Sequence, residues 1–405
     1  MITAPGEGLR SGQANAPRRT KLALVCDFLE ERWPSMDLFG DMLFERVAVE
    51  HAVAFDVEQL RPALRPRFSR LPGLGRAGLL WNADRFLNRF HDYPVWLKQR
   101  AARFDLFHLV DHSYSQLILD LPAERTVVTC HDLDTFKCIL EPESDPRPRW
   151  FRAMAQRSLD GFLKAAHVIC VSSFTRANIL RHGLFAPDRI TVIPPGVDPV
   201  FFSADPEPQA GAAGKMKYLL HVGSTIRRKR IDVLLRVFAR VVRQLPGLQL
   251  MRVGGPLTAQ QWRLAEELGI AGQIVQSPPL TKAQLAGVYQ QAAIALQTSD
   301  AEGFGLPVIE SMACGCPVVA SDIAPLKEAG GTAAEYCPSG DIEGWSETVI
   351  RLLREREMSP QAWELRRLRA RQHARGYTWS ENANQTISVY QRICNRDTWE
   401  PKPCL

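Results

Sequence analysis

Two glutamates lie eight positions apart in the stretch AEGFGLPVIESMACGCPVVAS, residues 301–321. The glycines between them permit positive φ and a close approach of a ligand to the backbone. Pro307 suits a first helical turn, because its missing N–H would be unpaired there anyway. We therefore predict a loop that holds Glu302, followed by a short helix that carries Glu310 and stops at Gly315.

The free backbone N–H groups at the start of this helix, around residues 304–308, would form an anion site suited to phosphate. Carboxylates beside such a site repel phosphate but accept hydrogen bonds from sugar hydroxyls. A nucleotide-sugar, with hydroxyls at both ends and phosphates between them, would satisfy both features. The alternative is a solvated loop acid followed by a helix acid at a favourable position in the helix dipole.

A second stretch, HVGSTIRRKRIDVLL at residues 221–235, places Gly223 and Ser224 after an apolar strand and four cations before a helix. The cations of residues 227–230 could neutralise a leaving diphosphate, with Arg as a bidentate fork and Lys as a point charge. Such runs are usually solvated. The position between strand and helix favours a functional interpretation here.

Short apolar strands alternate with amphipathic helices along the chain, which predicts parallel sheets covered by helices. Strands are expected near residues 21–28, 106–110, 126–130, 167–171 and 189–195, and again near 218–222, 248–255, 274–276, 293–297 and 316–321. The Pro/Ala/Gly-rich stretch 203–217 separates the two sets as a linker. We predict an α/β protein of two doubly wound Rossmann-like domains that face a cleft, with ligands at the carboxyl ends of the strands.

Composition agrees with this architecture. The chain has 405 residues, 45% apolar and 23% charged, with a net charge of +6, which suits two globular domains. Nine cysteines, mostly in apolar runs, suggest reduced thiols in a cytoplasmic protein. Cys314 and Cys316 lack zinc-type partners, so no metal is expected. Residues 1–20 resemble a flexible tail and not a signal peptide, and no apolar run of about 18 residues predicts a membrane span.

Positive charge is concentrated between Arg61 and Arg103, where nine Arg and one Lys face two Asp. Aromatic residues interleave with these charges, a mixture expected of a surface that meets anionic lipid. The alternative, which we favour slightly, is a solvated basic face whose aromatics point into the core. No RNA- or DNA-binding motif accompanies the charge, so nucleic acid is not an expected partner.

The segment SDAEGFGLPVIESMACGCPVVAS closely resembles the E-x7-E motif of the retaining glycosyltransferases of family 4, which have the GT-B fold. Further stretches match in the family's order, so that the resemblance runs from about residue 21 to residue 395. They are VVTCHDL, VICVSSFTRANI, ITVIPPGVDPVFF, VGSTIRRKRIDVLLRVF and LTKAQLAGVYQQAAIALQTSDAEGFG. The resemblance implies a tail (1–20), an acceptor-side domain (21–202), a linker (203–217), a nucleotide-sugar-binding domain (218–378) and a closing helix that returns to the first domain (379–405).

The resemblance also implies roles for single residues. Glu302 would contact the donor sugar and Glu310 the ribose of the nucleotide. Arg228 and Lys229 would hold the donor diphosphate and stabilise its departure, assisted by main-chain N–H groups. His131 would lie near the transferred sugar, and Asp132 beside it would orient a loop or the acceptor. The implied donor-site residues also include Gly223, Ser224, Gly303, Phe304, Gly305 and Leu306.

Two positions depart from the family pattern. Many relatives carry a Gly-Gly pair in the first strand-to-helix loop, where this chain has Ser35 and Met36. Many also have Arg directly after the Val-Gly pair, where this chain has Ser224, which makes Arg228 the expected cation. Donor contacts from the first loop are therefore not implied here.

The implied reaction is transfer of a sugar from a nucleotide-diphosphate sugar, GDP-mannose-like or UDP-linked, to a glycan or lipid-linked acceptor at the cytoplasmic side of a membrane, for cell-surface polysaccharide or glycolipid synthesis. Configuration would be retained, and neither metal nor cofactor is expected because Arg and Lys supply the countercharge. A sugar phosphorylase would need a pyridoxal phosphate lysine, and none is singled out. A protein of another class, a non-catalytic GT-B scaffold that docks on a membrane, is the remaining alternative.

Overall fold

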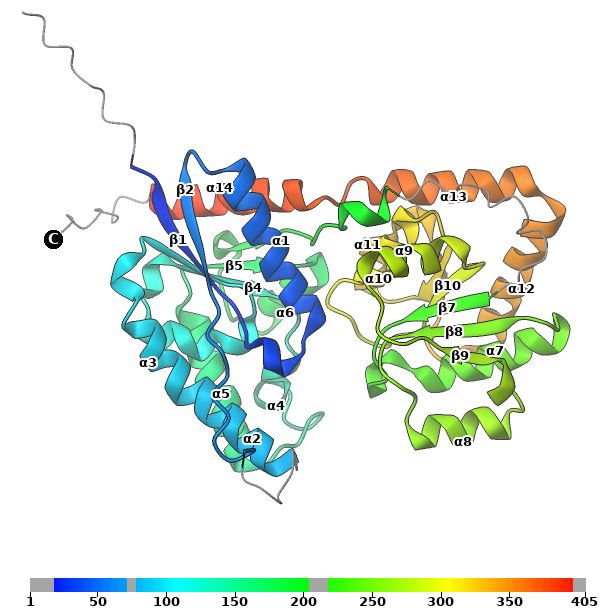
Figure 1. Ribbon diagram of the computed structural model, residues 1–405, viewed down its shortest axis with the longest axis horizontal. Coiled ribbons are helices and arrows are strands. Elements are labelled where there is room, and N and C mark those ends of the chain that lie inside the picture. The colour runs from blue at the N-terminus through cyan, green and yellow to red at the C-terminus, as the bar shows by residue number, and fades with distance from the viewer. Residues whose placement is uncertain (1–17, 71–77, 204–217, 396–405) are drawn as a thin grey trace, which may run out of the picture.

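The computed structural model describes residues 18–70, 78–203 and 218–395, which form two lobes side by side (Figure 1). The first lobe is built on a six-stranded parallel sheet in the order β2-β1-β3-β4-β5-β6. Its strands are β1 (Thr20–Val25), β2 (Phe55–Leu60), β3 (Leu106–Leu109), β4 (Thr126–Cys130), β5 (His167–Cys170) and β6 (Ile190–Val192). Its helices are α1 (Pro34–Glu50), α2 (Gly78–Leu87), α3 (Tyr93–Lys98), α4 (Lys137–Leu140), α5 (Arg149–Lys164) and α6 (Ser173–Arg181).

The second lobe repeats the plan with the order β12-β11-β10-β7-β8-β9, again parallel between all neighbours. Its strands are β7 (Tyr218–Val222), β8 (Gln249–Val253), β9 (Ile274–Gln276), β10 (Ile294–Gln297), β11 (Val318–Ser321) and β12 (Glu335–Cys337). Its helices are α7 (Ile231–Gln244), α8 (Ala259–Glu267), α9 (Lys282–Gln291), α10 (Leu306–Ala313), α11 (Ala324–Gly330), α12 (Ile342–Met358) and α13 (Pro360–Ala374). The predicted α/β class and the two Rossmann-like sheets are thus confirmed.

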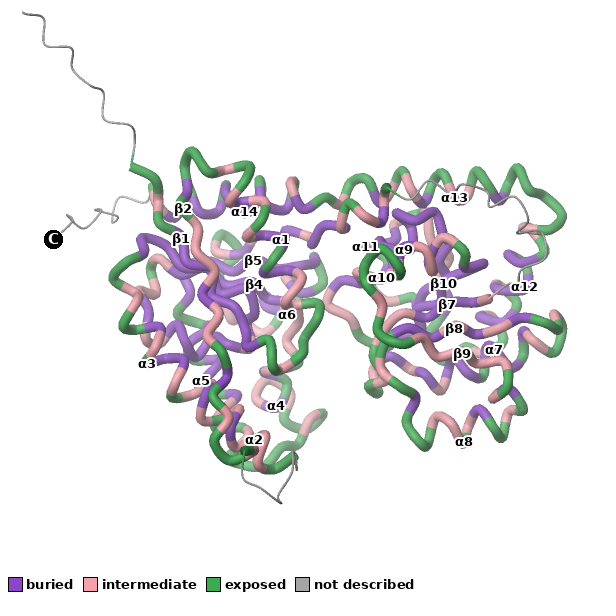
Figure 2. The backbone as a smooth tube through the Cα atoms, viewed as in Figure 1, coloured by how far each residue is buried: buried purple, intermediate pink, exposed green. Residues whose placement is uncertain are grey.

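The central strands are buried on both faces, as expected where helices cover a parallel sheet; Figure 2 shows them in the buried centres of the lobes. β3, β4, β5, β10 and β11 are buried at every residue. This burial explains why these strands read as continuous apolar runs in the sequence and not as alternating patterns.

The last helix, α14 (Trp379–Cys394), leaves the second lobe and packs on the first (Figure 1). The Tyr390 hydroxyl lies 2.6 Å from His108 Nδ1 in the first sheet, and the Trp379 ring packs edge-on against Phe39 of α1. At Gly196 a Cβ would lie 2.3 Å from the Trp379 nitrogen, so only glycine permits the two chain segments to cross here. The chain therefore passes twice between the lobes.

The structure leaves part of the predicted domain division outside the described residues. The tail through residue 17, the linker from residue 204 and the last ten residues lie there, so those bounds stay predictions. None of the described helices is long and apolar enough to cross a membrane.

Candidate functional site at the facing sheet edges

The N-terminus of α10 follows the strand β10. Between β7 and β10 the strand order of the second sheet reverses, because β8 and β9 lie on one side of β7 and β10 to β12 lie on the other. Open α/β sheets bind ligands at such switch points, outside the carboxyl ends of the strands. Gly305 caps the helix with φ of 120°, and a Cβ there would lie 2.7 Å from the Leu326 side chain. Phe304 is buried against Tyr377. The N–H groups of residues 303–306 are therefore held by a glycine-dependent turn.

Glu302 precedes this turn and is fixed by four side chains. Its Oε1 accepts from Lys229 Nζ at 2.5 Å, Ser299 Oγ at 2.6 Å and Gln297 Nε2 at 3.1 Å. Its Oε2 accepts from Arg228 Nη1 at 2.8 Å. Burial raises the pKa of Glu302, but Lys229 and Arg228 outweigh it and hold that pKa below its ordinary value. The carboxylate is therefore ionised and immobile.

The cations of residues 227–230 have different partners in the structure. Arg227–Lys229 form a 3-10 turn, and Arg230 takes a left-handed conformation at its end. Arg230 then turns away to pair with Asp232 and Asp300. Arg228 and Lys229 alone among the four meet Glu302, which is the pair selected from the sequence.

Gly223 follows β7 with φ of 152°, and its carbonyl oxygen lies 2.2 Å from the position of a Cβ on Gly254. Two glycines are therefore needed where the loops after β7 and β8 touch. A Cβ on Gly223 would lie 3.8 Å from Lys229 Nζ, so this loop borders the basic pair. Ser224 is exposed beside it.

Glu310 lies one turn inside α10 and experiences a different environment. The Tyr289 hydroxyl donates a hydrogen bond to Glu310 Oε2 at 3.1 Å. Burial raises the pKa of Glu310 to about 7, partly opposed by that hydrogen bond. Glu310 therefore exchanges its proton close to neutral pH.

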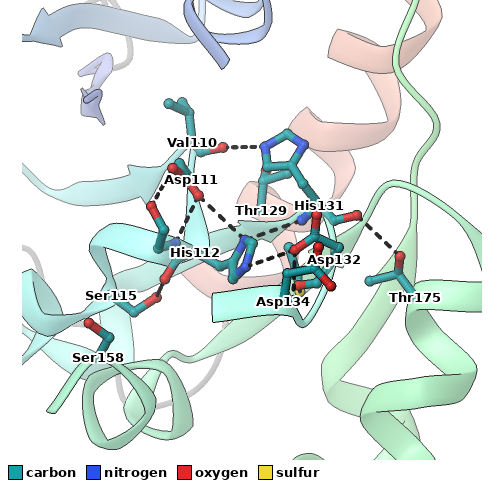
Figure 3. Close-up of polar contacts among 12 residues, drawn as sticks. Val110, Asp111, His112, Ser115, Thr129, His131, Asp132, Asp134, Ser158 and Thr175 are labelled. Carbon is teal, nitrogen blue, oxygen red and sulfur yellow. Dashed lines mark hydrogen bonds and ion pairs between the residues drawn. The ribbon is translucent and has the colours of Figure 1, made fainter. Parts of the chain in front are cut away.

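His131 follows β4 on the facing edge of the first sheet (Figure 3). Its Nε2–H donates to the Val110 carbonyl at 2.8 Å, which leaves Nδ1 with its lone pair. Burial lowers the pKa of His131, with Asp111 opposing the shift in part. A neutral imidazole at this edge can accept a hydrogen bond from a hydroxyl but carries no charge to attract phosphate.

His112 lies beside His131 and is almost fully buried (Figure 3). Its Nδ1 lies 3.4 Å from Asp111 Oδ1, and its Nε2 lies 3.7 Å from Asp132 Oδ1. The Asp132 carboxylate thus lies beside a histidine of its own lobe. It also interacts electrostatically with Arg228 of the other lobe, whose pKa it helps to raise. This contact fits the role of orienting residue that the resemblance implies for Asp132.

The loops at the facing edges of the two sheets touch through a backbone contact. A Cβ on Gly303 would lie 2.1 Å from the carbonyl oxygen of His131, so the loop that holds Glu302 contacts the loop that holds His131. A cavity of about 400 Å³ opens beside this contact and is lined from both lobes by His131, Asp132 and Arg228. Trp33, Ser35 and Met36 of the first strand-to-helix loop line it as well.

Family models match both lobes. Residues 47–201 match the model described as Glycosyltransferase Family 4, and residues 205–368 match the model described as Glycosyl transferases group 1. Together the two matches cover well over half of the chain. The chain belongs to the family 4 glycosyltransferases.

Individual relatives agree with the family. The D-inositol 3-phosphate glycosyltransferase of Mycolicibacterium smegmatis is 34% identical over 216 residues, which are 50% of this family 4 chain and 48% of the relative. The O-antigen chain mannosyltransferase B of Escherichia coli is 28% identical over 285 residues, 67% of this chain and 71% of the relative. The chain spans about half the length of the D-inositol 3-phosphate glycosyltransferase that it matches.

Solved structures share the GT-B fold. The sucrose-phosphate synthase of Thermosynechococcus elongatus has a TM-score of 0.69 at 22% identity, with 93% of this family 4 chain and 99% of that chain covered. HepE of Anabaena, solved in complex with UDP-glucose, has a TM-score of 0.66 at 16% identity, with coverages of 92% and 100%. These likenesses confirm the predicted GT-B architecture.

Several residues at the site were not predicted. Ser299 and Gln297 orient Glu302, Tyr289 hydrogen-bonds to Glu310, and His112 packs beside His131. The polar residues that end β10, in the letters QTSD, were the available signal for the first two. Tyr289 lies in the helix α9, where nothing local marks it.

The basic segment from Arg61 to Arg103 divides its side chains between the interior and the surface. Tyr93 is buried, whereas Leu79 is 81% exposed and Phe86 51% exposed. Several of its arginines pair inside the lobe, such as Arg85 with Glu31 at 2.9 Å. The predicted contact with anionic membrane is therefore left to a smaller set of exposed side chains and stays a hypothesis.

Proposed function

We propose that this protein transfers a sugar from a nucleotide-diphosphate sugar to a hydroxyl of a glycan or lipid-linked acceptor, with retention of configuration. The observation that supports it best is the ionised Glu302 held between Arg228 and Lys229, at the glycine-dependent N-terminus of α10 and in contact with the His131 loop. The roles of these residues in donor binding belong to the same proposal.

The donor diphosphate would bind the N–H groups of residues 303–306 together with Arg228 and Lys229. Breaking the bond between the anomeric carbon and the diphosphate oxygen leaves an oxocarbenium-like sugar, and the cations stabilise the charge that develops on the leaving group. The acceptor oxygen bonds to the anomeric carbon on the same face, and its proton passes to the departing diphosphate. Since the leaving group takes the proton, no carboxylate pair with glycosidase spacing is required.

The donor class has support from two sides. The relatives include a mannosyltransferase, and a protein of the same fold binds UDP-glucose. We propose a GDP-mannose-like or UDP-linked donor for this chain. The acceptor would enter the cavity lined by His131 and Trp33, and a lipid-linked acceptor would agree with a peripheral contact of the exposed Leu79 and Phe86 with anionic membrane.

Binding of UDP, GDP, ADP and their common sugar conjugates, measured by thermal shift, tests the donor site. One nucleotide family should raise the melting temperature of the wild type, because a ligand at 100 times its Kd stabilises by about 2.7 kcal/mol. Lys229→Ala should weaken that shift, since it removes a buried contact of the diphosphate. A wild type that no nucleotide stabilises would contradict the proposal.

Transfer assays with Glu302→Ala separate an enzyme from a non-catalytic scaffold. Loss of this buried anchor should lower the transfer rate by about 100-fold or more, whereas Glu266→Ala on the exposed face of α8 should leave it unchanged. EDTA should not slow the wild type, because Arg228 and Lys229 provide the countercharge. Complete loss of rate on chelation would contradict the metal-free part of the proposal.

A further inference from the structure

Arg252 is a buried cation that no carboxylate of the described residues neutralises. It lies in β8, is 1% exposed, and donates from Nη1 to His221 Nδ1 and from Nη2 to the Gly255 carbonyl at 3.3 Å. Its Nε has no hydrogen-bond partner, and no carboxylate within the described ranges pairs with the guanidinium. Charges in protein interiors are normally paired, because taking an ion out of water is costly.

The positive charge belongs to Arg252 and not to its histidine partner. Burial lowers the pKa of Arg252 to about 10, which still leaves the guanidinium charged at neutral pH. Burial, together with Arg252 and Lys229 nearby, lowers the pKa of His221 well below its ordinary value. The neutral imidazole therefore accepts the hydrogen bond and contributes no charge.

The guanidinium lies beneath the loops that border the proposed donor site. His221 and Arg252 are direct neighbours across β7 and β8, and a Cβ on Gly223 would lie 3.3 Å from His221 Cε1. Arg252 also holds the carbonyl of Gly255, the residue after the glycine that contacts Gly223. The Arg252 side chain thus contacts the loop after β8 directly, through Gly255, and the loop after β7 through His221, which lies next to Gly223.

We propose that Arg252 is a positioning residue for the donor, and that the donor diphosphate supplies the countercharge which the interior lacks. Its charge acts through the glycine loops, without direct contact, and adds to the field of Arg228 and Lys229, both of which are partly neutralised by Glu302. Within a poorly screened interior such a field extends over several ångströms. This inference rests on the proposed function and deepens its donor site.

A ligand series of increasing charge tests the proposal. With the base that the wild type prefers, the nucleoside, the monophosphate and the diphosphate are titrated by calorimetry into wild type, Arg252→Met and Arg252→Lys. Arg252→Met should bind the nucleoside as the wild type does and the diphosphate about tenfold more weakly, as the loss of one nearby charge predicts. Arg252→Lys should retain most of the diphosphate affinity.

Arg243→Met is the matched control, because it removes one exposed cation from the end of α7 and should change none of the affinities. Equal weakening of all three ligands by Arg252→Met would reveal a purely structural role and overturn the inference. Unchanged diphosphate binding would overturn it as well. A wild type that binds no nucleotide would instead contradict the proposed function, and the inference with it.

A second measurement uses the unaltered protein, because removal of a buried arginine risks misfolding. The 15Nε resonance of Arg252, assigned by its absence in Arg252→Lys, should shift when the nucleoside diphosphate is added and stay in place with the nucleoside. An Nε resonance that responds equally to both ligands would contradict the proposed electrostatic link.

Discussion

Glu302 lies in the loop before α10 and Glu310 lies inside that helix, and their surroundings shift their pKa values in opposite directions. Two cations hold the pKa of Glu302 low despite its burial, whereas burial raises that of Glu310 to about 7. Glu302 is thus a fixed negative charge, and Glu310 is a group whose charge depends on pH. The two acids therefore differ in charge behaviour although they share one loop and helix.

Glu310→Gln should stabilise the protein above neutral pH. The folded protein keeps the Glu310 proton up to about pH 7, while the unfolded chain loses it near its ordinary value, so wild-type stability falls as pH rises across that window. At pH 8 the variant should be more stable by about 3 kcal/mol, and the gain should vanish near pH 4.5. Urea unfolding at pH 4.5 and pH 8 measures the difference.

Glu302→Gln provides the opposite control for this measurement. Its folded pKa is lowered, so the wild-type charge stabilises the fold at neutral pH and the variant should be less stable there. A gain at pH 8 in both variants would contradict the assignment of the two environments.

At the scale of the elements, the loop before α10 was predictable because its signals are local. Gly305, Pro307 and Gly315 each demand or favour one backbone conformation, and both glycines show the expected positive φ. The contact between Gly303 and the His131 carbonyl was not predictable, because residues 172 positions apart leave no local pattern. The helices α2 and α3 were missed as well, since they are short, at ten and six residues, and offer too few turns for a helical period to show.

Gly303→Ala should separate the facing loops. A Cβ would lie 2.1 Å from the His131 carbonyl oxygen, so the backbone contact between the lobes cannot persist. Transfer should fall by about 100-fold, the loss expected of a displacement of about 1 Å at a reacting centre, while binding of the nucleoside, which lacks the diphosphate that the N–H groups of residues 303–306 would hold, should change little. Kinetics and calorimetry on the same preparation measure the two effects.

Gly272→Ala is the control, because a Cβ there would meet nothing within 4 Å. If Gly303→Ala retained the full transfer rate, the two loops would not need to touch during the reaction.

At the scale of the whole molecule, a second contact holds the lobes together. Both carboxylate oxygens of Glu328 in α11 lie 2.8 Å from the backbone nitrogen of Ser173, the first residue of α6. A carboxylate at a helix N-terminus interacts favourably with the unpaired N–H groups and the dipole. One lobe therefore caps a helix of the other, and this cap exists only while the lobes are close.

Glu328→Ala should shift the molecule towards open arrangements. Loss of the cap should cost about 1 kcal/mol, which changes the ratio of closed to open molecules about fivefold. Energy transfer between dyes on α5 and α12 should decrease at low salt, and the difference should shrink at high salt because the contact is exposed. Glu347→Ala, on the exposed side of α12, should leave the energy transfer between the dyes unchanged. An identical decrease in this variant would rule out a specific cap.

The packing of α14 on the first sheet also sets the order of events when the chain is made. Tyr390 completes the hydrogen bonds of His108, and Trp379 and Ile387 fill the same face. The ribosome releases this helix only after the entire second lobe. The apolar face of the first lobe therefore stays uncovered until synthesis is complete, and exposed apolar surface of this kind makes a folding intermediate prone to aggregate.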